Sequence, residues 1–220
     1  MKNLIVAIDG PAGAGKSTVA QLAAKELGCT YIDTGAMYRA VAWKTLQQGK
    51  PVTDELIVDV VKDIHVELAY KEGKTIVTVD GTDVTGEIRT PEVTGIVSQV
   101  AALGPVRSRM VELQRRMAEN GSVLMDGRDI ATNVLPNANV KIFLTASIEE
   151  RARRRYKEMK EKGYEVTLEE LQKDIAARDK ADSEREISPL RQAPDAELLD
   201  TSDMGIDEVV QAIVDRCRNV

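Results

Sequence analysis

Residues 4–18 read LIVAIDGPAGAGKST, an apolar β-type run that leads into a glycine-rich turn ending in Lys-Ser. Gly10, Gly15, Lys16 and Ser17 match the GxxxxGK[ST] pattern without a mismatch. Glycines allow backbone dihedrals that a Cβ would forbid, so consecutive N–H groups can turn inward around a polyphosphate. Lys16 adds a positive charge, and the Ser17 hydroxyl can ligate Mg²⁺. The stretch therefore predicts a polyphosphate site at the start of the first helix.

The nucleotide is expected to contact the loop and the first turn of the helix after it. These residues are Gly10, Pro11, Ala12, Gly13, Ala14, Gly15, Lys16, Ser17 and Thr18. A glycine-rich turn that binds nothing is the structural alternative, but the strand before the loop and the helix after it favour the phosphate site. The pattern does not select the reaction, because switch GTPases, motor ATPases and small-molecule kinases share it.

The composition is typical of a compact α/β protein. The 220 residues suit one domain with a small lobe, and 43% of them are hydrophobic. Aromatic residues make up only 3%, so we expect an aliphatic interior, as in a parallel sheet covered by helices on both faces. The net charge of −6 provides no basic excess for binding nucleic acid or an anionic membrane.

The supply of reactive side chains excludes several mechanisms. His65 is the single histidine, which argues against a Ser-His-Asp mechanism and against a multi-histidine metal site. Cys29 and Cys217 have no metal-ligand spacing, so we expect reduced packing residues. The apolar run before Asp9 is too short for a signal peptide or a membrane span. We therefore expect a cytoplasmic protein, a monomer, that acts on small molecules.

Strands and helices alternate along the chain, which predicts a doubly wound parallel sheet with five core strands. The strands are expected at 4–8, 29–33, 122–126, 140–144 and 198–200. Helices are expected from the loop to Gly28 and at 34–48, 53–62, 90–101, 106–118, 147–162, 167–182 and 206–217. Between 65 and 86 the hydrophobic period changes to two, with breaks at 71–74 and 80–81. This region predicts an antiparallel hairpin in a small lobe, and 120–122 is expected to be a turn rather than a glycosylation site.

Acidic residues end two of the predicted core strands, where the ligands of open α/β sheets collect. Asp126 and Asp33 are the candidates for holding Mg²⁺ together with Ser17. An acid at a strand end can equally cap the next helix. The segment Asp126-Gly127-Arg128-Asp129 predicts a sharp turn with one guanidinium between two carboxylates, able to grip a phosphate or accept from an exocyclic amine. A salt-bridged turn is its structural alternative.

Arginines are clustered although the protein is acidic. Candidate anion-binding positions are Arg39, Arg107, Arg151, Arg154, Arg155, Arg178 and Arg185, with Asp182 at helical spacing between the last two. Any one of them can be an ordinary solvated residue of a charged helix. As a group they can neutralise the negative charges that phosphoryl transfer brings together.

No catalytic base is evident, and a phosphate oxygen needs none to attack, because it is already anionic. These features indicate a kinase whose acceptor is itself a phosphate. A GTPase is the first rival: Asp83-Val84-Thr85-Gly86 matches DxxG, but it lies in the hairpin lobe and no NKxD motif follows. An ATPase that acts on a macromolecular partner is the second, although no basic surface or long dimerisation helix is evident.

Six segments together resemble bacterial cytidylate kinase, of the nucleoside monophosphate kinase family, in register and essentially end to end. They are IDGPAGAGKST at 8–18, IDTGAMYRA at 32–40, GEIRTPEV at 86–93, SQVAALGPVR at 98–107, MDGRD at 125–129 and RDKADSEREISPL at 178–190. The resemblance implies ATP-dependent phosphorylation of CMP, and also of dCMP, with Mg²⁺. A kinase for UMP or AMP is the alternative within this class.

The resemblance also implies roles for individual residues. Ser98, Arg107 and Asp129 would read cytosine, Arg39 and Arg128 would hold the acceptor phosphate near Thr34, Arg178 and Asp182 would bind the sugar, and Arg185 would meet the phosphates. The implied catalytic set is Lys16, Arg128, Arg185 and Arg154, the last preferred over Arg151 and Arg155. Thr34 stands where the family also has Ser, a conservative change.

The same resemblance implies three parts of the chain. The core would comprise 1–35, 104–146 and 183–220, and the acceptor-binding lobe 36–103, with an insertion at about 62–100. A helical lid and the helix after it would occupy 147–182.

Overall fold

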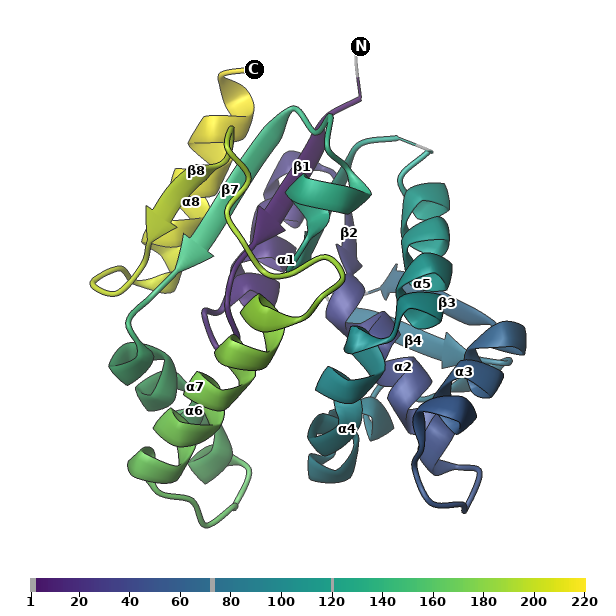
Figure 1. The fold of residues 1–220 in the computed structure, drawn as a ribbon. Helices are drawn as coiled ribbons and strands as arrows, with labels where there is room; N and C mark the ends of the chain where they lie inside the picture. The colour runs from purple at the N-terminus through teal and green to yellow at the C-terminus, as the bar shows by residue number, and fades with distance from the viewer. Residues whose placement is uncertain (1–2, 72–73, 120) are drawn as a thin grey trace.

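The computed structural model describes residues 3–71, 74–119 and 121–220, and its centre is a parallel sheet with helices on both faces (Figure 1). The core strands are β1 (Ile5–Asp9), β2 (Thr30–Asp33), β6 (Val123–Gly127), β7 (Val140–Thr145) and β8 (Glu197–Asp200). Their order is β2-β6-β1-β7-β8, and every pairing is parallel. The predicted five-stranded doubly wound sheet is confirmed.

The helices lie close to the predicted ranges. They are α1 (Lys16–Leu27), α2 (Thr34–Leu46), α3 (Asp54–Asp63), α4 (Pro91–Ala102), α5 (Gly104–Met117), α6 (Ile148–Glu161), α7 (Leu168–Glu184) and α8 (Ile206–Arg218). Gly28 ends α1 in the left-handed conformation, and the Thr53 hydroxyl caps α3 by accepting from Leu56 N. No helix among the described residues has the length and apolar composition needed to cross a membrane.

Two aliphatic clusters cover the faces of the sheet. On one face α1 and α8 pack on β1, β7 and β8 through buried residues such as Ala20, Ile142 and Ile213. On the other face β1 and β6 pack on the segment after β6 and on part of α5, through Met125, Ile130 and their neighbours. Because both faces are covered, the central strands are apolar throughout, and polar side chains collect at the strand ends.

A third cluster lies in the part of the chain between β2 and α5. Here α2, α3, α4 and the short 3₁₀ helix η1 (Glu87–Arg89) share buried residues with β3 (Val66–Lys71) and β4 (Lys74–Val79). The antiparallel pairing of β3 with β4 confirms the predicted hairpin. The expected turn at 71–74 and the expected turn at 120–122 include residues 72, 73 and 120, which lie outside the described residues.

Besides η1, two features of the structure are absent from the sequence prediction. The short strand β5 (Thr82–Asp83) extends the hairpin to three strands, and two residues are too few to show a period. The π-helical turn η2 (Ile130–Val134) follows β6 directly. π turns are rare, and five residues are too few to show a hydrophobic period, so the sequence pattern did not indicate this one.

Candidate functional site

The loop between β1 and α1 has the backbone conformation that its glycines permit. Gly13 and Gly15 have φ angles of 71° and 82°, the left-handed region that disfavours other residues. Gly10 is needed for a different reason: a Cβ there would lie 1.9 Å from the carbonyl oxygen of Leu144 on β7. The loop is thus pressed against the end of β7 and opens toward the start of α1.

Lys16 is folded back over this loop. Its Nζ donates to the Pro11 carbonyl over 2.7 Å, and the residue is 5% exposed. Burial, and then the positive charge of Arg128, lower the pKa of Lys16 well below its ordinary value. A buried cation among other cations gains from a nearby anion, so a phosphate group at the loop would stabilise the charged form.

Asp126 joins the loop to the end of β6. Its two carboxylate oxygens accept from the Ser17 hydroxyl at 3.1 Å and from the Tyr31 hydroxyl at 2.7 Å. Burial, followed by the neighbouring Asp33, raises the pKa of Asp126 to about 6. A carboxylate beside a serine hydroxyl is a hard-oxygen donor set of the kind that Mg²⁺ prefers, so these residues fit the metal.

Asp33 lies opposite Asp126 in the register of β2 and β6. One of its oxygens accepts from Ala36 N over 2.9 Å and caps α2, and the other pairs with Arg89 over 3.0 Å. The capping alternative therefore describes Asp33 in this structure. Its part in holding Mg²⁺ stays a prediction. Arg89 already neutralises the charge of this carboxylate, and its own positive charge would oppose a nearby metal cation.

Arg107 and Asp129, the expected base-reading residues, form a buried ion pair at 2.5 Å. Arg107 also donates to the Ala101 carbonyl over 3.0 Å, and its guanidinium lies 5.3 Å from the ring centre of Tyr38. Ser98 is half-buried on α4, three residues before Ala101 and hence on the same side of the helix. Arg107 and Asp129 thus meet from α5 and the turn after β6, and the part of Ser98 in reading cytosine stays a prediction.

The arginines expected at the acceptor phosphate and sugar gather beside this pair. Arg128 donates to Asp182 over 2.9 Å, and Arg39 donates to the Thr94 hydroxyl over 2.8 Å. Arg178 makes no hydrogen bond or ion pair to a residue in the described part of the chain, and its Nε is buried. Burial, and then the positive charge of Arg128, lower the pKa of Arg178 to about 10. Burial, and then the positive charge of Arg178, lower the pKa of Arg39 to about 10 as well. Each of these cations disfavours the charged form of the others, so an anion bound among them would be stabilised, which makes this cluster a candidate anion site.

Arg185 lies between the base-reading pair and the residues expected at the phosphate and sugar. Its Nε donates to the Ser188 carbonyl over 2.8 Å, and its other nitrogens lie 4.0 Å from Asp129 and 3.9 Å from Asp182. Thr34, by contrast, uses its hydroxyl within the protein, donating to the Asp126 carbonyl over 2.7 Å.

Two of the four arginines on α6 reach the phosphate loop. Arg151 is buried, donating to the Ala12 carbonyl over 2.9 Å and to Asp179 over 2.7 Å. Arg154 donates to the Ala14 carbonyl over 3.4 Å and to the Thr201 carbonyl over 2.6 Å. Arg155 pairs with Glu158 on its own helix. The preference for Arg154 as the residue that meets the donor stays a prediction, and Arg151 occupies a position of the same kind.

Asp9 is a site-forming residue that the sequence analysis did not identify. Its oxygens accept from the backbone N–H groups of Ile130 and Ala131, both at 2.8 Å, and so fix the start of η2 to the end of β1. Burial raises the pKa of Asp9 to about 6 although these two hydrogen bonds oppose the shift. Its position at a strand end, as for Asp33 and Asp126, is the signal that points to it.

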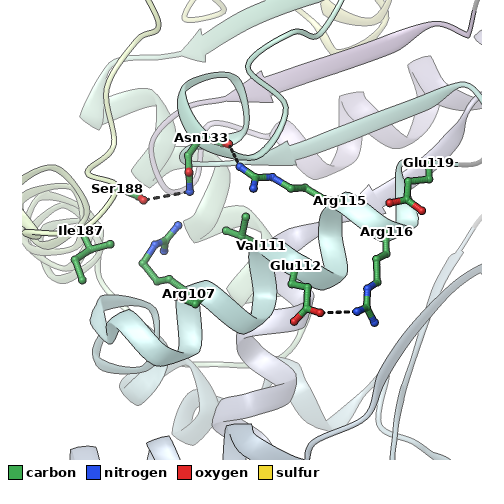
Figure 2. A pocket seen from close by; sticks show the side chains of 10 residues that line it. Arg107, Val111, Glu112, Arg115, Arg116, Glu119, Asn133, Ile187 and Ser188 are labelled. Atoms are coloured by element: carbon green, nitrogen blue, oxygen red, sulfur yellow. Dashed lines mark hydrogen bonds and ion pairs between the residues drawn. The ribbon is translucent and has the colours of Figure 1, made fainter.

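A cavity of about 580 Å³ lies behind the base-reading pair rather than at the phosphate loop. Figure 2 shows α5 along one side of it, with Asn133 and Ser188 opposite. Of the predicted site residues only Arg107 lines it. This cavity therefore borders the base-reading pair from outside, and its lining does not include the phosphate loop.

Comparison with known proteins identifies the family. The family model described as cytidylate kinase matches residues 6–219. The chain belongs to the cytidylate kinase family. The match spans the phosphate loop, the turn after β6 and α7 together, so it covers every predicted site residue of this cytidylate kinase family member.

Individual relatives support the same assignment. The cytidylate kinases of Bacillus thuringiensis (strain Al Hakam) and Bacillus anthracis (strain CDC 684 / NRRL 3495) are each 52% identical to the chain over 214 residues, covering 97% of it and 95% of the relative. A crystal structure of an uncharacterized protein from Eubacterium ventriosum ATCC 27560 superposes with a TM-score of 0.56, at 14% identity over the whole of both chains. At this identity the likeness concerns the α/β fold alone.

Proposed function

We propose that this chain transfers the γ-phosphoryl group of ATP to CMP and dCMP, giving ADP and the pyrimidine diphosphate. The observation that carries the proposal is the buried Arg107–Asp129 ion pair beside a cluster of under-neutralised arginines, with a phosphate loop at the end of the adjacent strand. The family assignment and the 52% identical relatives named cytidylate kinase support it.

Base selection follows from the chemistry of the paired side chains. An ionised Asp129 only accepts hydrogen bonds, so it suits the exocyclic amine of cytosine, and the Arg107 and Ser98 donors suit the ring nitrogen and carbonyl. Uracil presents a carbonyl where cytosine has the amine. That carbonyl would face an acceptor, which favours CMP over UMP by about 1–3 kcal/mol.

Phosphate binding follows from the cations that surround the loop. The acceptor phosphate would lie among Arg39, Arg128 and Arg185, and Lys16 would lie at the donor phosphates. Each of these groups gains a counter-charge when the substrates bind. The charge that spreads over the phosphoryl oxygens in the transition state is then stabilised by groups already in place.

We also propose that Mg²⁺ accompanies ATP, with Ser17 and Asp126 as its protein contacts and Asp33 nearby. When bound, it neutralises phosphate charge and orients the donor. Asp126 is held for this task by Tyr31, whose hydrogen bond prevents the carboxylate from turning away. The acceptor oxygen attacks as an anion, so no residue has to remove a proton.

Lobe and lid movement is part of the proposal, because closure over the substrates excludes water that would otherwise hydrolyse ATP. Arg151 and Arg154, which already reach the loop from α6, are the contacts through which the lid would act. We further propose a cytoplasmic monomer without a nucleic-acid partner. The two buried free cysteines are consistent with a reducing compartment.

A coupled kinase assay tests this function. ADP formation is measured with ATP and Mg²⁺ against AMP, CMP, UMP, GMP and dCMP in turn. Turnover with CMP and dCMP well above the others supports the proposal, and a preference for UMP or AMP would move the assignment to that nucleotide. Turnover that ignores every monophosphate but rises with a macromolecule would identify an ATPase instead.

A further inference from the structure

The Asp129 carboxylate is held by a second donor besides Arg107. The side-chain amide of Asn133, one turn later on η2, donates to Asp129 Oδ2 over 3.0 Å, and the same oxygen accepts from Arg107. The other oxygen, Oδ1, accepts no hydrogen bond from the described residues, and Arg185 lies 4.0 Å from it. Two donors on one oxygen therefore leave the other oxygen free for a ligand.

The orientation of the Asn133 amide is set by its partners. An ionised carboxylate only accepts, so the amide must present its NH₂ group to Asp129. The same NH₂ group donates to the Ser188 hydroxyl over 3.3 Å, which uses its second hydrogen. Figure 2 shows this bond between Asn133 and Ser188, on the side of the cavity opposite α5. Both hydrogens thus have acceptors, and the flipped amide would place its oxygen against the carboxylate.

The backbone that carries this amide is also fixed. Arg115 on α5 donates to the Asn133 carbonyl over 2.7 Å (Figure 2). It also donates to the Val134 carbonyl over 3.0 Å. At the other end of η2, Asp9 holds the N–H groups of Ile130 and Ala131. A side chain mounted on a backbone clamped at both ends can impose a direction on its neighbour.

We propose that Asn133 is a positioning residue for pyrimidine recognition: it locks the rotation of the Asp129 carboxylate so that Oδ1 faces the exocyclic amine of the substrate. The inference rests on the proposed function, in which Asp129 reads cytosine. Without Asn133, Arg107 alone holds the carboxylate, which can rotate and pair more closely with Arg185. Discrimination between CMP and UMP then weakens while phosphoryl transfer continues.

The test compares kcat and KM for CMP, UMP and ATP in variants of the full chain. Asn133→Leu keeps the size of the side chain and removes its donor. Asn133→Asp puts a second acceptor against Asp129. Thr132→Val, at the adjacent position of η2, is the matched control. For Asn133→Leu we expect the ratio of kcat/KM for CMP to that for UMP to fall about tenfold, mainly through KM for CMP. For Asn133→Asp this ratio should fall further, and for Thr132→Val it should not change.

A double-mutant cycle separates positioning from a general loss of stability. If Asn133 acts through Asp129, then Asn133→Leu changes nothing further in an Asp129→Ala background. Additive effects, or an unchanged CMP/UMP ratio in a folded Asn133→Leu protein, would overturn the inference. Thermal unfolding checks folding, and Asn133→Ala replaces Asn133→Leu if the latter unfolds. If Asp129→Ala alone leaves the ratio unchanged, the base-reading part of the proposed function fails, which is a separate outcome.

Discussion

The Ser17 hydroxyl donates to the Asp126 carboxylate over 3.1 Å, joining the first turn of α1 to the end of β6. The two residues are 109 positions apart in the chain, and the parallel pairing of β1 with β6 brings their elements together. Because Tyr31 holds the other oxygen of Asp126, the carboxylate is fixed on both sides. The expected metal contacts are therefore assembled by the sheet, independently of a ligand.

Replacing Asp126 with Asn should make the protein more stable at neutral pH. Burial raises the pKa of Asp126 from 3.8 to about 6, so the folded state favours the protonated acid. Its stabilising contribution is present below pH 4 and is lost as the pH rises through 6. The difference between the two values corresponds to about 3 kcal/mol, and the neutral amide avoids this loss.

Urea unfolding of both proteins at pH 4.5 and pH 7.5 measures this effect. The gain in unfolding free energy for Asp126→Asn should be larger at pH 7.5 than at pH 4.5, while kinase activity falls. The exposed Asp174→Asn is the control and should show no such dependence. A variant that is less stable than the parent at pH 7.5 would contradict the prediction.

Lys16→Ala should abolish phosphoryl transfer without unfolding the protein. The ammonium lies at the expected donor phosphates, and removing one preorganised positive contact costs about 10²–10³ in kcat. Its pKa is already lowered by burial and by Arg128, so losing the charge does not destabilise the fold. Steady-state kinetics and circular dichroism measure the two effects, with the exposed Lys25→Ala on the same helix as control. Retained activity would exclude the loop assignment.

Asp129→Asn should shift selectivity from CMP toward UMP. Arg107 and Asn133 both donate to one side of this residue, so the amide oxygen stays there and the NH₂ group faces the substrate. That group opposes the amine of cytosine and suits the carbonyl of uracil, a change of about 1–3 kcal/mol in relative kcat/KM. Asp129→Ala should only erode the preference for CMP. Unaltered selectivity in both variants would remove Asp129 from base recognition.

Arg151 and Arg154 should differ in what their loss costs. Arg151→Met breaks a buried ion pair with Asp179 and frees the Ala12 carbonyl, so the unfolding free energy should fall by about 3 kcal/mol. Arg154→Ala should leave stability nearly unchanged and raise KM for ATP about tenfold, the effect of losing one charge-assisted contact. Arg153→Ala, an exposed position of the same helix, is the control for both measurements. An unchanged KM for ATP in Arg154→Ala would transfer the donor contact to Arg151.

Most of the features that could be predicted from the sequence depend on residues close together in the chain. The loop, the caps at Gly28 and Thr53, and the hairpin between 65 and 86 follow from backbone preferences and hydrophobic period, which neighbouring residues express directly. The acids at 33 and 126 were recognisable because strand ends are where an open α/β sheet exposes polar groups. The roles predicted for Arg178 and Arg185 rest on the family resemblance, since a charged helix alone does not distinguish a site from a solvated face.

By itself, the sequence determined a five-stranded doubly wound sheet, the glycine-rich loop at which a phosphate site is predicted, and the set of residues available for chemistry. Only the tertiary structure decided which of those residues meet. It placed Asp33 as the cap of α2, brought Tyr31 to Asp126, and set Asp9 and Arg115 at the two ends of η2. The physical reason is that a buried carboxylate must find donors wherever the fold supplies them. Those donors come from strands and helices far apart in the chain, so a local sequence pattern does not predict them.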